Sequence, residues 1–491
     1  MKTLGIDMGS SSVKVSLMDV ATGRCVASST NPKVEMPIDA PRAGWAEQEP
    51  EMWWRYICDG IRAVGAEHPL SDVCAVGITY QMHGLVMLDK SGRPLRKAII
   101  WCDSRAVETG AEAFEALGAE RCLTHLLNSP GNFTASKAAW VRRNEPDTFA
   151  RADKFMLPGD YAAYRLSGKI STTESGLSEQ ILWDFAEGRR ADFVADHYGI
   201  PLPMIPEAGV SIGVGAVTNA ETERMFGIPA GTPISYRAGD QPNNAFSLNV
   251  LDAGEVAATG GTSGVVYGVA DTRKYDPLSR VNTFLHVNHT ASAPRYGILL
   301  CINGTGIMNS WLRRNIAAGM DYDEMNRLAA GVPAGSEGLL AVPFGNGAER
   351  VLGNRSTGAS FAGIDLNRHT TAHMIRAVHE GIAYSFRYGM DIMRQTGVNP
   401  SVIRAGKANL FLSPIFRETL ATLTGADIEL FNTDGSLGAA RGAALGAGLY
   451  KSREEAFASL TRLETVRPNP AWRDALEAGY AAWRKEVENK L

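Results

Sequence analysis

Near the N-terminus, an acid is followed by a run of small, hydroxyl-bearing residues. Asp7 ends a predicted buried strand, and a tight turn that contains Ser10, Ser11 and Ser12 follows it. Small residues let backbone N–H groups approach an anion, and the serine hydroxyls add further donors. A carboxylate in this position could hold Mg²⁺ directly or through water. The same residues also suit an ordinary hairpin turn with a solvated acid, so this turn alone does not fix a function.

A second turn of this kind spans residues 260–264, between two predicted strands in the second half of the chain. Gly261 and Thr262 again supply exposed amides and a hydroxyl. Two such turns, one in each half, favour a pair of phosphate-binding hairpins over two unrelated turns. Neither matches the pattern GxxxxGK[ST], which disfavours a P-loop site.

Asp240 lies where a predicted strand, Pro233–Arg237, runs through a glycine into a predicted helix. A carboxylate at such a junction could accept the proton of an attacking hydroxyl, while Gln241 hydrogen-bonds neighbouring hydroxyls. An aspartate here could equally cap the helix N-terminus, and the two roles are compatible.

Two further segments follow predicted strands and carry groups that suit a polyhydroxylated ligand. Met82 and His83 belong to Gln-Met-His-Gly, directly after the apolar run Val73–Tyr80. Trp101 ends the next predicted strand, at 98–101. A lone histidine is more often structural than a metal ligand, and a tryptophan more often packs in the core or at its rim.

The elements that must position these residues alternate between strands and helices, which indicates α/β architecture with a mixed sheet. The motif of strand, small-residue turn and strand occurs near the start of each half, as in a weak internal duplication. We therefore predict one domain over 1–248 and a second over 249–491.

The 491-residue composition is that of a globular enzyme, with 45% hydrophobic and 21% charged residues and a net charge of -4. The absence of like-charge blocks argues against a nucleic-acid partner. No leader-like segment or membrane-length apolar run occurs, and the six cysteines are scattered. These features predict a cytoplasmic protein with reduced thiols and no membrane partner.

Several segments, in this order, resemble the FGGY family of carbohydrate kinases, most of all its members that phosphorylate xylulose. The resemblance runs from about residue 3 to about residue 450. Its most specific segments are GIDMGSSSVKVSLMD at the start, GWAEQEPEMWW at 44–54, QMHG at 81–84, WCDSR at 101–105, FTASKAAWV at 133–141, LPGDYAAYRLSG at 157–168, TGGTSG at 259–264 and DGSLGAARGAALGAG at 434–448.

The resemblance implies two actin-like, ribonuclease-H-like domains with a catalytic cleft between them, and an ATP- and Mg²⁺-dependent kinase. A small sugar would be the partner, D-xylulose phosphorylated to D-xylulose 5-phosphate, and a homodimer the assembly. Asp240 would be the general base, with Asp7 and Asp240 at the metal. The sugar would contact Met82, His83, Trp101, Asp240 and Gln241, and ATP would contact Ser10, Ser11, Ser12, Gly261, Thr262, Gly406, Lys407 and Asn409.

The chain departs from the family pattern at two places near these residues. The glycine-rich turn expected after the strand 401–405 reads Ala-Gly-Lys-Ala-Asn, and Gln241 replaces the asparagine of the xylulose-phosphorylating members. Three alternatives therefore stay open: a kinase for gluconate, ribulose, glycerol or another polyol, a sugar sensor with a decayed nucleotide site, and an actin- or chaperone-like ATPase.

Overall fold

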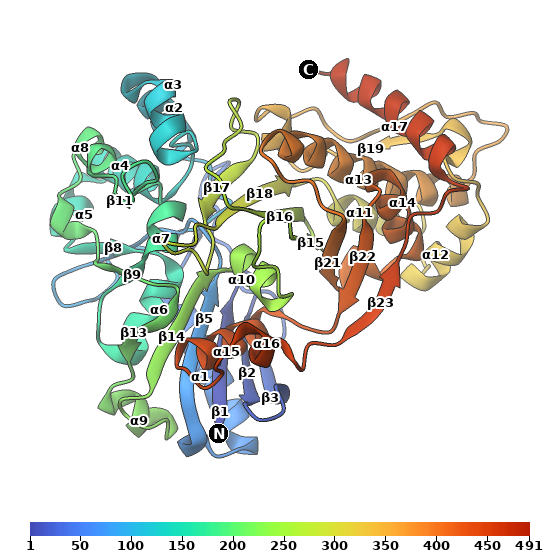
Figure 1. Ribbon diagram of the computed structural model, residues 1–491. Coiled ribbons are helices and arrows are strands. Elements are labelled where there is room, and N and C mark those ends of the chain that lie inside the picture. The colour runs from blue at the N-terminus through green and yellow to red at the C-terminus, as the bar shows by residue number, and fades with distance from the viewer. The chain divides into compact units, whose positions relative to one another are not determined.

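The computed structural model describes residues 1–491 and confirms the predicted α/β architecture (Figure 1). Its contacts group the chain into two compact units, each of which is discontinuous in sequence. Unit 1 comprises Met1–Leu251, Phe284–Tyr296 and Thr433–Leu460, and unit 2 comprises Asp252–Thr283, Gly297–Asn432 and Thr461–Leu491. The sequence division at 248/249 stays a prediction about domains. In the structure, the late segment 433–460 is part of unit 1.

The centre of unit 1 is a six-stranded sheet with the order β13-β14-β5-β1-β2-β3. Strand β1 pairs antiparallel with β2 and parallel with β5. Strand β5 in turn pairs in parallel with β14. The small turn predicted at 8–12 joins β1 to β2, as expected. The strands are β1 Lys2–Met8, β2 Val13–Asp19, β3 Arg24–Asn31, β4 Glu47–Gln48, β5 Val73–Tyr80, β6 Val86–Leu88, β7 Ala98–Ile99, β8 Lys154–Met156, β9 Thr172–Thr173, β10 Trp183–Asp184, β11 Arg189–Arg190, β12 Ala208–Gly209, β13 Ile212–Val217 and β14 Pro233–Gly239.

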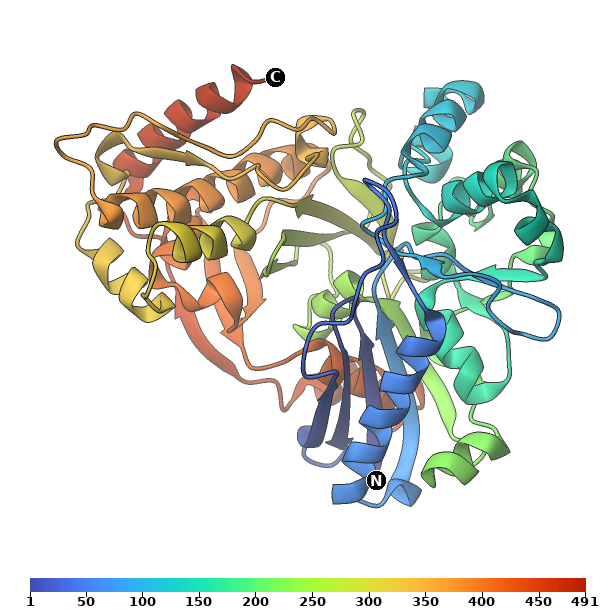
Figure 2. The same cartoon turned by 180° about the vertical axis from the view of Figure 1, so that it is seen from behind.

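Helices cover both faces of this sheet because its central strands are apolar on both sides. Helix α15 lies in front of the sheet in Figure 1, and α1 crosses the opposite face in Figure 2. The helices of unit 1 are α1 Pro50–Glu67, α2 Val107–Leu117, α3 Ala119–Arg121, α4 Thr134–Asn144, α5 Pro146–Arg151, α6 Pro158–Ser167, α7 Glu174–Glu179, α8 Asp192–Tyr198, α9 Ala220–Phe226, α10 Asp240–Ser247, α15 Gly435–Gly446 and α16 Arg453–Phe457.

Helix α15 packs with its backbone almost on the sheet. A side chain at Gly5 in β1 would overlap the carbonyl of Ser436, and one at Gly77 in β5 would overlap that of Ala439. Only glycine allows so close an approach, so these two positions set the height of α15 above the strands that carry the site.

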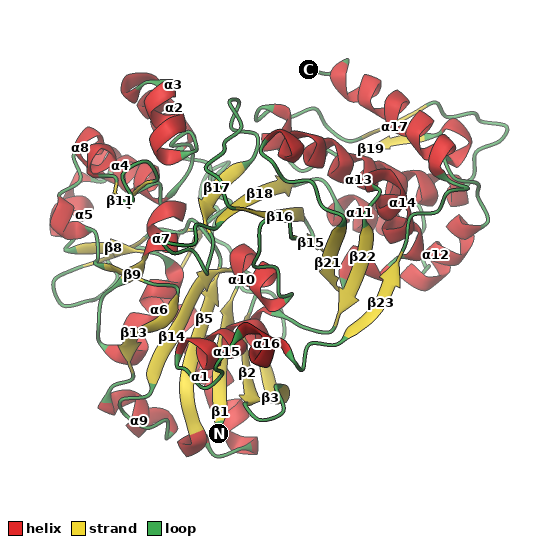
Figure 3. Ribbon diagram, in the orientation of Figure 1, coloured by secondary structure: helices red, strands yellow, loops and turns green.

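Unit 2 is built on a seven-stranded sheet with the order β17-β18-β16-β15-β21-β22-β23, whose strands are yellow and whose helices are red in Figure 3. Its long helix, α13, packs on α14 and β19 over an extensive apolar core. The strands are β15 Val256–Gly260, β16 Gly264–Ala270, β17 Asn282–Leu285, β18 Tyr296–Ile302, β19 Leu340–Val342, β20 Ser360–Ala362, β21 Val402–Gly406, β22 Asp427–Phe431 and β23 Arg462–Val466, and the helices are α11 Gly306–Asn315, α12 Tyr322–Ala330, α13 Thr371–Gln395, α14 Pro414–Thr424 and α17 Arg473–Glu488.

The predicted strand at 98–101 is shorter than expected. Strand β7 covers only Ala98–Ile99, because the amide of Asp103 bonds the carbonyl of Ile100 (3.2 Å) and turns the chain there. No helix of the structure is both long enough and apolar enough to cross a membrane.

Candidate active site

Three parallel strands of unit 1 end at the same edge of the sheet, and each delivers a polar residue there. Asp7 is the second-to-last residue of β1 and pairs with Thr79 of β5. Gln81 follows β5 directly, and Asp240 follows β14. The backbone holds this edge together, since the amide of Gln81 donates to the carbonyl of Met8 (2.8 Å). In open α/β sheets, ligands bind at the carboxyl ends of the strands.

A cavity of about 270 Å³ opens at this edge. Its lining is mostly polar and lies wholly within unit 1, comprising Asp7, Gly9, Ser10, Ser11, Ser12, Lys14, Gln81, Trp101 and Asp240. The structure thus gathers the first predicted turn, the predicted base and the predicted aromatic residue around one space. Trp101 is 41% exposed, and its indole N–H donates to the hydroxyl of Ser10 (3.3 Å).

Asp7 lies among other acids, and this controls its charge. Burial, followed by the charges of Asp240 and Asp434, raises the pKa of Asp7 to about 7, although Lys14 opposes the shift. Lys14 itself pairs with Asp434 at 2.7 Å, at the N-terminus of α15. Gly435 follows, and a Cβ there would overlap the Asp7 carboxylate, with its Cγ only 2.8 Å away.

Asp240 is the first residue of α10 and is only partly exposed. Burial raises the pKa of Asp240 to about 7, while hydrogen bonds from the backbone and side chain of Gln241 pull that pKa downward. A carboxylate that titrates near neutrality suits a general base, because part of it is ionised at neutral pH and the ionised form is basic enough to take a proton.

Met82 and His83 lie beside this edge but do not line the cavity. Gly239, just before Asp240, leaves room for the Met82 side chain, since a Cβ there would lie 2.5 Å from Met82 Cγ. His83 has a positive φ of 60° and hydrogen-bonds through Nδ1 to the backbone carbonyl of Glu179 (3.0 Å). The ring of His83 also packs edge-on against Phe133, with centroids 4.8 Å apart.

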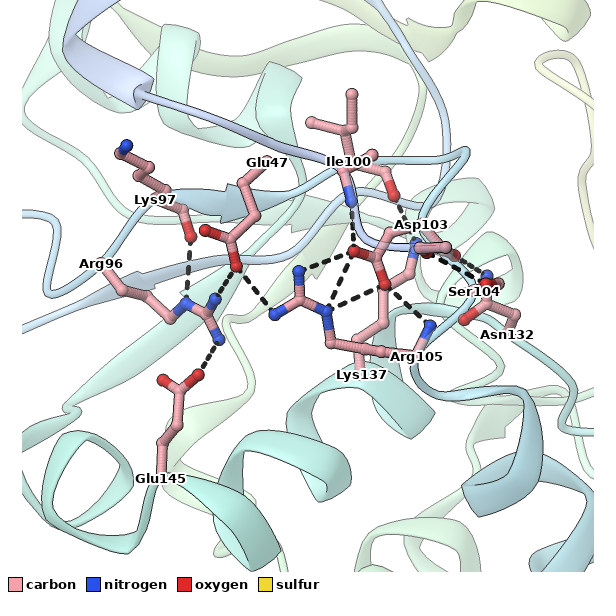
Figure 4. Close-up of polar contacts among 12 residues, drawn as sticks. Glu47, Arg96, Lys97, Ile100, Asp103, Ser104, Arg105, Asn132, Lys137 and Glu145 are labelled. Atoms are coloured by element: carbon pink, nitrogen blue, oxygen red, sulfur yellow. Dashed lines mark hydrogen bonds and ion pairs between the residues drawn. The ribbon is translucent and has the colours of Figure 1, made fainter. Parts of the chain in front are cut away.

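A network of buried ion pairs fixes the segment that carries Trp101 (Figure 4). The Arg105 guanidinium pairs with Asp103 and with Glu47, both at 2.7 Å, and Glu47 also pairs with Arg96. The side chains of Arg105 and Asp103 are 1% and 0% exposed. Removing one partner of such a buried pair leaves an uncompensated charge, so loss of either Arg105 or Asp103 would be strongly destabilising.

Lys137 in α4 ties this segment to the Gln-Met-His-Gly segment. Its buried ammonium donates to the carbonyl of His83 (2.8 Å) and to the carbonyl of Ile100 (3.0 Å). Burial lowers the pKa of Lys137 to about 8. One side chain thus sets the spacing between the two segments predicted to contact a sugar.

In unit 2, the second predicted turn and the altered glycine-rich turn lie at the same end of the sheet. Strands β15 and β21 are parallel neighbours, and the turns follow their last residues. The side-chain amide of Asn409 would lie 3.8 Å from a Cβ at Gly261. The amide of Ile307, at the start of α11, donates to the carbonyl of Thr262 (3.1 Å). Gly261, Thr262 and Asn409 are therefore neighbours within unit 2.

Lys407 follows β21 and is already paired. Its ammonium bonds Glu464 at 3.0 Å, and Arg417 bonds the other oxygen of that carboxylate at 2.7 Å. Its predicted contact with ATP would require this exposed pair to open, which costs little in water.

Sequence reasoning named Gln81 only as part of a polar segment and assigned no role to Lys14 or Asp434. All three lie in or beside the cavity. Gln81 had a signal, because it is the first polar residue after a buried strand. The sequence also contained a signal for Asp434, because an aspartate directly before a predicted helix is typical of an N-cap residue. Lys14 had none, because its partner is 420 residues away.

Family models match this chain over both halves. The model for the N-terminal domain of the FGGY family of carbohydrate kinases matches residues 2–247, and the model for the C-terminal domain matches residues 256–449. The chain belongs to the FGGY family of carbohydrate kinases. It is accordingly an ATP-dependent sugar kinase, which excludes the ATPase without a sugar acceptor.

Relatives of this FGGY kinase are similar along nearly their whole length. Xylulose kinase of Escherichia coli (strain K12) is 28% identical over 459 residues, which is 93% of this chain and 92% of that protein. Xylulose kinase of Staphylococcus epidermidis (strain ATCC 12228 / FDA PCI 1200) is 30% identical over 488 residues, 98% of this chain and 95% of that protein. The crystal structure of xylulose kinase from Rhodospirillum rubrum has a TM-score of 0.87 at 24% identity, covering 100% and 99% of the two chains. The two-domain fold implied by the resemblance is confirmed.

Proposed function

We propose that this FGGY kinase transfers the γ-phosphoryl group of ATP to the 5-hydroxyl of D-xylulose, which yields ADP and D-xylulose 5-phosphate. The full-length similarity to xylulose kinases supports this substrate. The observation that carries the proposal is the partly exposed Asp240 carboxylate on a polar cavity, at the strand edge that also holds Asp7 and the serine turn.

In the proposed reaction, Asp240 accepts the proton of the sugar hydroxyl as its oxygen bonds to the γ-phosphorus. The bond between that phosphorus and the bridging oxygen of the β-phosphate breaks, and ADP leaves. Phosphoryl transfer depends mainly on positioning and charge neutralisation, which fixed amides and hydroxyls supply. Met82, His83, Trp101 and Gln241 are proposed to hold the sugar beside Asp240.

The donor set at Asp7 fits a magnesium ion. No group of three or more histidine, cysteine or acidic residues could hold a metal alone. Mg²⁺ instead takes one or two carboxylates together with waters and substrate phosphates. Burial and then the charges of Asp240 and Asp434 raise the pKa of Asp7, and a cation beside Asp7 and Asp240 would offset both effects. Bound there, Mg²⁺ would neutralise phosphate charge.

We assign ATP to the small-residue turns of the two units. The proposed contacts are Ser10, Ser11 and Ser12 in unit 1, and Gly261, Thr262, Gly406, Lys407 and Asn409 in unit 2. The neighbouring positions of Gly261 and Asn409 support the second set.

The test is an ADP-release assay with purified protein, MgATP and a panel of ketoses, sugar acids and polyols. We expect turnover with D-xylulose at a kcat/KM at least tenfold above that of D-ribulose, glycerol and gluconate. Preferred turnover of glycerol, gluconate or ribulose would favour the alternative of a kinase for another polyol. Sugar binding without any ADP release would favour the sensor. A cytoplasmic location and a homodimer, both expected from the sequence, complete the proposal.

A further inference from the structure

Gln81 is almost completely buried, yet it lines the cavity beside Asp7 and Asp240. Its residue is 1% exposed, and its side-chain nitrogen donates to Gln48 Oε1 (3.3 Å). Its side-chain oxygen has no hydrogen-bond partner in the protein. A buried acceptor that lacks a donor costs free energy, so such groups in folded proteins are normally satisfied.

The side-chain amide of Gln48, the partner of Gln81, is held in one orientation by neighbours that are either donors only or acceptors only. The indole N–H of Trp53 is a donor only, and it bonds Gln48 Oε1 at 3.0 Å. On the other side, Gln48 Nε2 faces two carbonyl acceptors, those of Ser10 (2.7 Å) and Pro37 (3.2 Å). The Gln48 amide therefore has one permitted orientation.

This constraint passes from Gln48 to Gln81. Because Gln48 presents an acceptor, the atom of Gln81 that faces it must be the N–H₂ group. The oxygen of Gln81 is then held away from Gln48 and lacks a donor. An acceptor held in this way recognises hydroxyl or other donor groups and disfavours carboxylates and ketone oxygens at the same point.

We propose that Gln81 is a further substrate-binding residue, whose side-chain oxygen accepts a hydrogen bond from a sugar hydroxyl in an orientation set by Trp53 through Gln48. This inference rests on the proposed function, because it takes the ligand to be the polyhydroxylated acceptor. Trp53 and Gln48 are positioning residues, since they act through Gln81 and do not touch the sugar. Gln48 also holds the carbonyl of Ser10, so the same side chain joins the sugar contact to the serine turn.

The decisive experiment pairs Gln81→Met with deoxy analogues of the sugar, each lacking one hydroxyl. Methionine has nearly the volume of glutamine but provides no amide oxygen. We expect kcat/KM for the full sugar to fall about tenfold, the value of a typical net hydrogen bond, with the KM for ATP unchanged. For the one analogue that lacks the contacted hydroxyl, wild type and variant should have equal kcat/KM. Loss of the same factor with every analogue, or no loss with any, would overturn the inference.

Trp53→Phe tests the orientation separately, because it removes the indole N–H while Gln81 stays in place. We expect a smaller fall in kcat/KM for the full sugar, with the same analogue dependence. Combining it with Gln81→Met should add no further loss, since the two changes act on one hydrogen bond. Fully additive losses would show that Trp53 acts only through the core.

Gln180 provides the matched control. It is a 0% exposed glutamine whose side-chain oxygen also lacks a partner, but it does not line the cavity. Gln180→Met should leave the ratio between full and deoxy sugars unchanged, so a change there would contradict a specific role for Gln81.

The outcome for wild-type protein separates this inference from the proposed function. If the wild type phosphorylates another polyol, the assignment to xylulose fails. The comparison of wild type, Gln81→Met and Trp53→Phe is then made with deoxy forms of that polyol. If the wild type phosphorylates none, the kinase proposal fails and the same comparison is made on sugar binding by calorimetry. Absence of any sugar binding would then overturn the inference as well.

Discussion

At the scale of single residues, the cavity keeps two carboxylates whose charges repel each other. The charge of Asp240 helps to raise the pKa of Asp7, and burial raises both to about 7. Lys14 opposes the pKa shift of Asp7, and the hydrogen bonds of Gln241 oppose that of Asp240, each only in part. Raised pKa values in two neighbouring acids are typical of catalytic sites, in keeping with the proposed roles of Asp7 and Asp240.

Replacing Asp240 separates its effect on the rate of reaction from its effect on the stability of the fold. Asp240→Asn keeps the shape but removes the base, so we expect kcat to fall by about 10²–10⁴. The midpoint of thermal unfolding should stay equal or rise, because the charge that repels Asp7 is gone. ADP release and thermal unfolding measure the two effects. Turnover close to that of wild type would refute the assignment of the base.

At this scale, the sequence could predict which polar residues lie at the strand edge, while their roles stay predictions. Asp7, the serines and Asp240 are each recognisable as a polar group after a strand. The amide orientation of Gln81 was not predictable, because it depends on Trp53 and Gln48, which the chain brings in from outside the motif. The pairing of Lys407 with Glu464 was hidden for the same reason.

At the scale of elements, the start of α15 presses against Asp7. Gly435→Ala would place a methyl group on the carboxylate, with Asp7 Cγ at 2.8 Å. Either the helix or Asp7 must shift, and a displacement near 1 Å can cost about 10²-fold in rate. We expect a loss of that order in kcat/KM. Gly209→Ala, where nothing lies within 4 Å of the added Cβ, is the control. Equal activity of both variants would contradict the close contact.

Helix α13 buries a histidine whose pKa affects stability. Burial, and then the charge of Arg376, lowers the pKa of His379 to about 4 from 6.5. Between these values the unfolded chain binds a proton that the folded protein does not, so stability is lost as pH falls from about 6.5 towards 4. The shift corresponds to about 3 kcal/mol.

His379→Gln should therefore flatten the decline in unfolding free energy over this pH window. Denaturant unfolding at several pH values measures the difference between the two proteins, which separates His379 from neighbouring groups such as Glu380. The exposed His197 on α8 is the control, and His197→Gln should follow the wild-type curve. Parallel curves for His379→Gln and wild type would disprove the effect.

At the scale of the whole molecule, element order was more predictable than element grouping. The strands on either side of both small-residue turns followed from the residue pattern along the chain. The grouping of 433–460 with unit 1 did not, because local spacing says nothing about which sheet a helix covers. The close fit of α15 on Gly5 and Gly77 is the physical reason for that grouping.

A truncated chain that ends at Asn432 tests this grouping. It lacks α15 and α16, which bury Tyr236, Phe246 and Ala75 in one apolar cluster of unit 1. We expect the amides of β1 and β5 to lose protection from hydrogen exchange, since one face of their sheet is uncovered. The same measurement on a chain that ends at Leu460, which keeps both helices, is the control. Retained protection in the shorter chain would contradict the assignment.

The position of α15 near the end of the chain also affects folding during synthesis. Unit 1 starts at the first residue, yet its sheet stays open on one side until the ribosome has synthesised about nine-tenths of the chain, at residues 435–446. At typical translation rates of about 5–20 residues per second, the apolar side of this sheet is exposed for tens of seconds in the nascent polypeptide. Chaperones that bind exposed strands would therefore have the most time to bind unit 1, whose first strand carries Asp7.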